Sequence, residues 1–138
     1  MTIEYRIGIP SASGFAALFE TTGWNKAFHV SADELKAALQ GSWYAVSAYD
    51  DDQLVGFGRV LSDGVLYAVL CDLIVVPSHQ ARGIGSEILA RLVRQCTSAG
   101  IRSIQLFSAD GKTAFYEARG FEARAVDAPG MRLAMNQD

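Results

Sequence analysis

A nearly continuous apolar run in the middle of the chain constrains the fold more than any other feature. The run L-C-D-L-I-V-V occupies residues 70–76, at the end of a strand that we predict from Val65 to Val76. A run with so little polar alternation is typical of a strand covered on both faces of its sheet. A loop from Pro77 to Gly85 and an amphipathic helix from Ser86 to Ala99 follow, and Ile101 to Phe107 is again strand-like. Strand, crossover helix and strand form a βαβ unit, in which the two strands are parallel.

Two further strands precede this unit and predict an antiparallel meander. They run from Trp43 to Tyr49 and from Leu54 to Leu61, with the turn sequence D-D-D-Q between them, and S-D-G leads into the long strand. Short polar turns of this kind join antiparallel neighbours. The acidic residues 50–52 are therefore interpreted as a solvated hairpin turn.

The N-terminal region adds one strand and two helices to the prediction. Apolar residues alternate over residues 3–7, which predicts a strand. A helix follows Ser11 or Ser13, which are alternative N-caps. A second helix begins at Ser31, where S-A-D-E has the spacing of a capping box in which Glu34 reaches back to the N-cap.

The C-terminal region predicts one helix and two more strands. The helix runs from about Lys112 to Arg119, and the strands lie near Phe121 to Ala125 and from Met131 to Met135, with a turn over residues 127–131. Together these elements predict an α+β fold. Its centre is a mixed sheet of six to seven strands, with an antiparallel N-terminal meander, one βαβ unit and helices on both faces.

The composition is that of one domain that needs no cross-link to fold. Its 138 residues are 50% hydrophobic and carry a net charge of −3, and a chain of this length buries roughly two thirds of its unfolded surface. We therefore expect a single domain over residues 1–138. Cys71 and Cys96 lie in apolar runs without clustered histidines, which predicts reduced core thiols and no metal site.

Charge and hydropathy argue against two classes of partner. The net negative charge disfavours a nucleic-acid-binding protein, and no stretch approaches ~18 uninterrupted apolar residues, the length that spans a membrane. Residues 1–6 lack the basic and apolar regions of a secretory signal. We therefore expect a cytoplasmic protein with no nucleic-acid and no membrane partner.

The segment Q-A-R-G-I-G-S at residues 80–86 carries the strongest chemical signal. It joins the buried strand to the amphipathic helix, where backbone N–H groups and the helix dipole converge on an anion, and Gly83 and Gly85 remove Cβ atoms that would keep a diphosphate away. The same glycines would equally suit a simple tight turn. Two other phosphate loops fit poorly: Gly85 is not followed by the lysine of a Walker A loop, and Ile88 stands where a dinucleotide fingerprint has glycine or alanine.

Three ordered blocks carry a resemblance to a known family. The loop Q-A-R-G-I-G fits the signature Q/R-x-x-G-x-G/A, the strand sequence D-L-I-V-V-P precedes it, and A-F-Y-E-A-R-G-F follows from Ala114 to Phe121. Residues 65–121 thus resemble the GNAT superfamily of acyl-CoA-dependent N-acetyltransferases. The N-terminal residues resemble that family only in the order of their strands and helices, and this is the region where its members differ by substrate.

The resemblance implies acetyl-CoA as the acyl donor and assigns the residues that bind it. The pantetheine arm would pair with backbone groups of Leu73, Ile74 and Val75 like an added strand, and backbone N–H groups near Leu73 would stabilise the oxyanion. Backbone N–H groups of the loop would bind the pyrophosphate, assisted by the arginine side chain. The loop residues so assigned are Ala81, Arg82, Gly83, Ile84, Gly85 and Ser86.

Two side chains are candidates for proton transfer. Tyr116 matches the family's usual general acid, which protonates the departing thiolate, whereas without the resemblance it would be a packing residue beside Phe115. Some members carry a glutamate base on the strand over residues 101–107, which here holds no carboxylate. Asp72 is the nearest candidate for a base, against a structural hydrogen-bonding role; no base is needed if the amine arrives neutral or loses its proton through water. Ala109 stands where the family often has an asparagine that touches pantetheine.

Trp24 and Phe28 are the candidates for contact with the acceptor. They lie between the two N-terminal helices, in a link that in this family often overhangs the acceptor pocket, although they could equally be packing residues. His29 and His79 are predicted as exposed loop residues without a chemical role.

The resulting prediction is an enzyme that transfers the acetyl group of acetyl-CoA directly to a primary amine of a small molecule, amino acid or peptide. The alternative is a catalytically silent GNAT-fold module that binds acyl-CoA as a sensor or assembly partner. A nucleotide-binding Rossmann-like domain is disfavoured by the order of the elements. Because dimers are common in the family, a homodimer stays open beside a monomer.

Overall fold

The computed structural model describes residues 2–135 and contains two compact units, a first that ends at Leu106 and a second that begins at Phe107. The first unit is built on a mixed five-stranded sheet in the order β1-β2-β3-β4-β5. Its strands are β1 (Ile3–Ile7), β2 (Tyr44–Asp50), β3 (Gln53–Ser62), β4 (Tyr67–Val75) and β5 (Ser103–Leu106). The first four strands pair antiparallel and β5 pairs parallel to β4. The predicted meander and the parallel βαβ unit are therefore confirmed.

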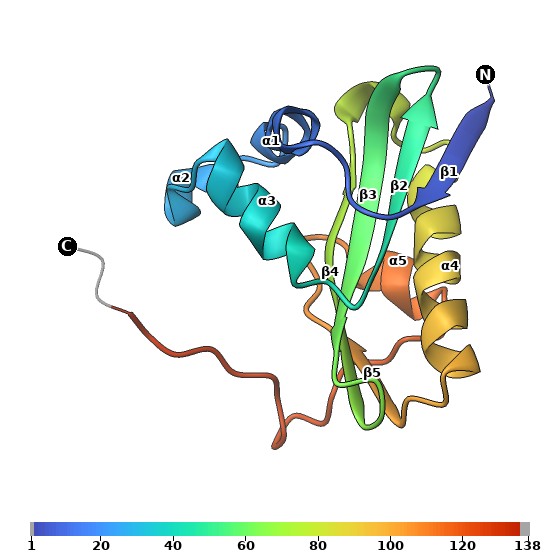
Figure 1. The fold of residues 1–138 in the computed structure, drawn as a ribbon. Coiled ribbons are helices and arrows are strands. Elements are labelled where there is room, and N and C mark those ends of the chain that lie inside the picture. Colours follow the sequence, from blue (N-terminus) through green and yellow to red (C-terminus); the bar gives the residue numbers. More distant parts are fainter. Residues whose placement is uncertain (1, 136–138) are drawn as a thin grey trace. The chain divides into compact units, whose positions relative to one another are not determined.

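Helices cover both faces of this sheet (Figure 1), as predicted. Helix α1 (Ala12–Glu20) packs against β3 and β4, and α2 (Asn25–Phe28) and α3 (Ala32–Gln40) follow on the same side. Helix α4 (Ile84–Ser98) covers the opposite face, against β2, β3 and β4. None of the helices in residues 2–135 is both long and apolar enough to cross a membrane.

Local capping residues set where the helices begin. Ser11 is the N-cap of α1, where its hydroxyl accepts a hydrogen bond from the Gly14 N–H at 3.1 Å. At α3 the predicted capping box is confirmed: the Ser31 hydroxyl accepts from the Glu34 N–H at 3.1 Å, and the Glu34 carboxylate accepts from the Ser31 N–H at 3.0 Å. These reciprocal bonds satisfy donors that a helix start leaves without partners.

Two glycines on β3 bring α4 close to the sheet. A Cβ atom at Gly58 would lie 2.8 Å from Ile88 Cγ2 and 3.0 Å from Leu92 Cδ1, and one at Gly56 would lie 3.0 Å from Ile88 Cδ1. Ile88 and Leu92 are fully buried. The helix can therefore approach the strand backbone only because these positions lack side chains. This close packing sets the distance of α4, and of the loop before it, from the sheet.

The second unit contains a short helix and a long exposed segment. Helix α5 (Thr113–Glu117) is somewhat shorter than predicted, and the described residues 121–135 form neither helix nor strand. The predicted strands at Phe121 to Ala125 and Met131 to Met135 are therefore wrong, and the sheet has five strands rather than six to seven. Alternating polar and apolar residues form a strand only where a neighbouring strand pairs with them. Here the apolar side chains of Met131 and Leu133 are not buried, because each is 84% exposed.

Candidate active site

Strand β4 has an unpaired edge within the first unit. Its pairing with β5 begins with Tyr67 opposite Ser103 and ends with Leu70 opposite Leu106, whereas its pairing with β3 continues to Val75. Residues 71–75 are therefore paired on one side only in this unit. A half-paired strand offers N–H and C=O groups to an extended ligand, which can add itself as the next strand.

A β-bulge interrupts β4 where this edge begins. The register shifts so that Gly58 of β3 lies opposite both Asp72 and Leu73. Asp72 has a left-handed backbone with φ 56°, a conformation that bulges often assign to glycine and that aspartate adopts more readily than most residues. The bulge takes Leu73 out of the regular ladder, and the family resemblance implies that backbone N–H groups near this residue stabilise the oxyanion.

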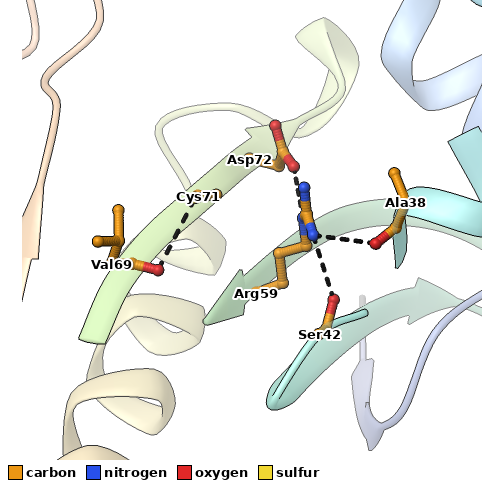
Figure 2. A network of polar contacts seen from close by, with 6 residues as sticks. All are labelled: Ala38, Ser42, Arg59, Val69, Cys71 and Asp72. Atoms are coloured by element: carbon orange, nitrogen blue, oxygen red, sulfur yellow. Dashed lines mark hydrogen bonds and ion pairs between the residues drawn. The ribbon is translucent and has the colours of Figure 1, made fainter. Parts of the chain in front are cut away.

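The candidate base Asp72 forms an ion pair with a residue of the neighbouring strand. Arg59 Nε donates to Asp72 Oδ2 at 2.7 Å, and the two side chains are only 13% and 22% exposed. Figure 2 shows the guanidinium reaching further, to the end of α3: Arg59 Nη1 donates to the Ala38 carbonyl at 3.2 Å and lies 3.5 Å from the Ser42 hydroxyl. A cation suits this position because helix carbonyls concentrate negative charge at a C-terminus.

The loop after β4 is tied to the strand before it. A short 3-10 helix, η1 (Pro77–His79), follows β4, and Gln80 Nε2 donates to the Val75 carbonyl at 3.0 Å. Ala81 and Gly83 are left-handed, with φ 62° and 82°. Such alternation of backbone conformation turns successive N–H groups toward one side, which is the geometry of an anion-binding nest.

Helix α4 begins at Ile84, two residues before the predicted start at Ser86. Its first intrahelical bond runs from the Glu87 N–H to the Gly83 carbonyl at 3.0 Å, so helix geometry gives the N–H groups of Ile84 and Gly85 no acceptor within the helix. The Ile84 side chain is 2% exposed. Its assigned contribution to donor binding would therefore come from its backbone, while the side chain anchors the loop in the core.

The remaining donor-binding candidates lie around this loop and along β4. Ala81 and Arg82 are exposed and Ser86 is half-buried. On β4, Leu73 and Val75 are half-buried, whereas the Ile74 side chain is buried in the core. Of these three side chains only Ile74 lies wholly in the core.

The prediction that His79 is an exposed loop residue is wrong. Its side chain is buried, with Nε2 2.8 Å from Asp50 Oδ2 and Nδ1 2.7 Å from Ser78 Oγ. Asp50 correspondingly departs from the predicted solvated turn, because only Asp51 and Asp52 form the exposed tip of the β2–β3 hairpin. The imidazole therefore ties that hairpin to the start of the glycine loop.

Tyr116, the candidate acid, belongs to the second unit. It lies on α5, with its ring edge-on to Phe115 at a centroid distance of 5.1 Å and to Phe121 at 6.0 Å. Burial raises the pKa of the Tyr116 hydroxyl above the usual value. The group therefore keeps its proton through neutral pH, which a general acid requires.

The acceptor-side candidates Trp24, the N-cap of α2, and Phe28, its last residue, share one buried partner. The ring of Phe19 lies 5.9 Å from that of Trp24 and 6.2 Å from that of Phe28. Trp24 is half-buried, whereas Phe28 is 66% exposed. Phe28 thus offers most of an aromatic ring to its surroundings. His29 is exposed, as predicted.

Both cysteines are free thiols, as predicted. Cys96 is fully buried and Cys71 is half-buried, and burial raises the pKa of each thiol. Raised pKa values leave little thiolate at neutral pH, so neither cysteine is set up as a nucleophile.

The roles of two polar residues, Arg59 and His79, were not predicted from the sequence. Arg59 interrupts the apolar strand sequence V-G-F-G-R-V-L, and Asp72 interrupts the next strand, so two opposite charges in adjacent antiparallel strands were a usable signal. His79 had no such signal, because its partner Asp50 is distant in the chain and adjacent only in the fold.

Comparison with known proteins agrees with this geometry. A family model described as an acetyltransferase (GNAT) domain matches residues 12–130. An acetyltransferase of the GNAT family from Streptococcus pneumoniae TIGR4 superposes with a TM-score of 0.81 at 26% identity, over 99% of this chain and 100% of that one.

Curated relatives are longer than this chain. An uncharacterized N-acetyltransferase ycf52-like of Prochlorococcus marinus is 29% identical over 75% of this chain and 58% of its own length. Serotonin N-acetyltransferase 2, chloroplastic, of Oryza sativa subsp. japonica is 34% identical over 72% of this chain and 50% of its own length. The chain thus spans about half the length of such relatives. Because the family model matches residues 12–130, which are most of the sequence, the chain belongs to the GNAT family of acetyltransferase domains.

Proposed function

We propose that this protein transfers the acetyl group of acetyl-CoA directly to a primary amine of a small molecule, amino acid or peptide. The observation that carries the proposal is the half-paired edge of β4, which leads through the short helix η1 to a glycine loop and a helix N-terminus. An extended polar arm and a diphosphate have the two chemistries that such a strand edge and such a loop bind.

The donor would be held mainly by main-chain groups. Leu73, Ile74 and Val75 supply backbone hydrogen bonds to the pantetheine arm in this proposal. Residues 81–86 supply N–H groups to the diphosphate, and the left-handed Gly83 provides the approach without a Cβ atom in the way. Arg82 adds positive charge at the exposed rim of the loop.

Acetyl-CoA supplies an acyl group activated as a thioester. The acceptor nitrogen forms the new C–N bond with the acyl carbon as the C–S bond breaks, and a backbone N–H near Leu73 donates to the acyl oxygen where negative charge develops. Tyr116 donates its hydroxyl proton to the departing sulfur and recovers a proton through water. The amine loses its own proton to water, or to Asp72 if that residue acts as a base.

The proposed acceptor is a primary amine, bound on the side of α1 and α2. The rice relative is named for serotonin, which carries a primary amine. Trp24 and the exposed Phe28 would contact the apolar part of such an acceptor.

An assay of free thiol released from acetyl-CoA across a panel of amines tests the proposal. The panel contains arylalkylamines, polyamines, amino acids and short peptides, and mass spectrometry identifies the acetylated product. Turnover of at least one primary amine is the expected result. Donor binding by calorimetry without turnover of any amine would instead favour the silent acyl-CoA-binding module.

A further inference from the structure

An ion pair within the sheet lies at the point where β4 leaves its ladder. Arg59 and Asp72 meet at 2.7 Å with both side chains largely buried. Such a pair is a weak source of net stability, because removing both charges from water offsets most of their attraction. Its place in the sheet therefore indicates a role in fixing geometry.

The ion pair spans the bulge itself. Asp72 is the left-handed residue of the bulge, and Arg59 directly follows Gly58, the residue that faces the bulge from β3. A left-handed non-glycine residue persists where its surroundings over-determine its conformation. The side-chain bond from the partner strand supplies such a constraint, and it acts on the residue directly before Leu73.

The guanidinium also connects the bulge to the end of α3. Arg59 Nη1 donates to the Ala38 carbonyl at 3.2 Å, in the last turn of that helix, and Ser42 lies in the link that follows. Figure 2 shows Arg59 lying between Asp72 on one side and Ala38 and Ser42 on the other. One side chain thus fixes β3, the bulge of β4 and the C-terminal end of α3 relative to one another.

We infer that Arg59 and Asp72 are positioning residues, which hold the bulge and the backbone N–H near Leu73 in the geometry that acyl transfer requires. The inference rests on the proposed function. It makes Asp72 a hydrogen-bond acceptor for Arg59 in place of a base. Neither side chain needs to touch donor or acceptor, since both act through the backbone of residues 72–73.

Removing the charge of Arg59 should therefore lower turnover more than donor binding. In Arg59→Gln we expect kcat to fall about 10- to 100-fold, because small misplacement of a group that stabilises developing charge has an effect of this size. The dissociation constant of acetyl-CoA should change by less than about 3-fold, because the glycine loop and α4 are untouched. Arg59→Lys keeps the charge without the planar fork and should recover part of the lost kcat.

A matched control and a double variant separate this role from general effects of charge. Arg6→Gln breaks the exposed pair of β1, in which the side chain of Arg6 is 45% and that of Glu4 is 62% exposed, and should leave kcat unchanged. Asp72→Asn keeps a side chain that tolerates the left-handed backbone. The double variant Arg59→Gln/Asp72→Asn should lose no more than the worse single variant, because the two residues act as one unit. Losses that multiply would overturn the inference.

The pH profile distinguishes a positioning pair from a base. If the pair only positions the backbone, the acidic limb of the kcat/KM profile in Asp72→Asn should have the same midpoint pH as in wild type, and only the maximal kcat/KM should fall. If the limb disappears in Asp72→Asn while Arg59→Gln retains nearly full turnover, Asp72 is a base and the inference is wrong.

Amide hydrogen exchange on the protein without ligand tests the geometry independently of catalysis. Residues 72–74 should exchange faster in Arg59→Gln and Asp72→Asn than in wild type or Arg6→Gln, while the core of α4 exchanges equally in all four. Equal protection at residues 72–74 would overturn the inference even in an active enzyme.

Failure of wild type to turn over any amine would count against the proposed function alone, because the exchange result still decides the role of the pair. If Arg59→Gln does not fold, Arg59→Lys and Asp72→Asn give the same readouts.

Discussion

Tyr116 combines a hydroxyl with a half-buried aromatic setting on α5, and burial raises the pKa of that hydroxyl. If it is the acid, Tyr116→Phe should lower kcat about 10²- to 10⁴-fold with little change in donor affinity. The acid form is the active one, so deprotonation of Tyr116 should lower wild-type turnover only above the ordinary tyrosine value of about 10. Thiol-release kinetics against pH measure both effects.

The matched control for Tyr116 is Tyr67→Phe, which removes a hydroxyl from an exposed ring at the start of β4. It should turn over like wild type. Equal rates for Tyr116→Phe and wild type would return Tyr116 to the role of a packing residue.

Gly83 shows how a loop residue can be required for its backbone alone. It is left-handed with φ 82°, and a Cβ atom built there would meet nothing within 4 Å. In the protein without donor, any effect of substitution therefore comes from the backbone conformation, and a side chain matters otherwise only where the diphosphate approaches. Gly83→Val should abolish measurable acetyl-CoA binding, whereas Gly83→Asn, which adopts left-handed backbone more readily, should retain affinity within about 10-fold. Calorimetry on folded variants decides, and unchanged affinity in Gly83→Val contradicts the assignment of the loop.

At the scale of elements, one imidazole ties the β2–β3 hairpin to the loop that precedes α4. His79→Ala would leave the half-buried Asp50 carboxylate without its ring partner. We expect a loss of about 1–3 kcal/mol in the free energy of unfolding, the usual effect of removing one partner of such a bond. His29→Ala, at an exposed position, should change stability by less than about 0.5 kcal/mol. Urea unfolding of both variants gives the comparison, and equal stability would contradict a structural role for His79.

The close approach of α4 to β3 gives a second prediction for elements. In Gly58→Ala the new methyl group would lie within 3.0 Å of Ile88 and Leu92, both fully buried. Overpacking of this kind costs about 1–3 kcal/mol. Gly41→Ala is the control, because a Cβ there would meet the Ala38 carbonyl at 3.4 Å and the backbone φ of −80° suits alanine. Thermal unfolding should show a clear loss for the first variant and little change for the second.

At the scale of the whole molecule, the described residues 122–135 are exposed and lie outside any helix or strand. Limited digestion with trypsin should therefore cut first after Arg124 or Arg132, since exposed backbone without regular hydrogen bonding is the preferred site of nicking. Mass spectrometry of early fragments identifies the cut. A first cut within residues 2–106 would contradict this view of the chain.

Local signals made much of the first unit predictable from sequence. The capping box at Ser31, the meander turns, and the strand, loop and helix around Gly83 each depend on residues close together in the chain. The prediction of C-terminal strands was wrong because alternating polar and apolar residues indicate that a strand would have two different faces, but do not indicate which strand it would pair with. The bond of Arg59 to Asp72 joins two neighbouring strands of the predicted meander, so their opposite charges hinted at the pair but not at its register. The bond of His79 to Asp50 joins segments that are distant in the chain, and no local pattern contains it.

The half-paired edge of β4 also bears on how the protein avoids aggregation. An open strand edge is a template on which another chain can pair, and proteins protect such edges with bulges and with charged side chains within the strand. The edge of β4 opens beside a bulge whose left-handed residue is an aspartate. A foreign β-strand would meet this break in the regular repeat of N–H and C=O groups before it could extend along residues 71–75. The bulge that shapes the proposed binding site for an extended ligand thus also hinders the continuous, flat strand pairing on which fibrils depend.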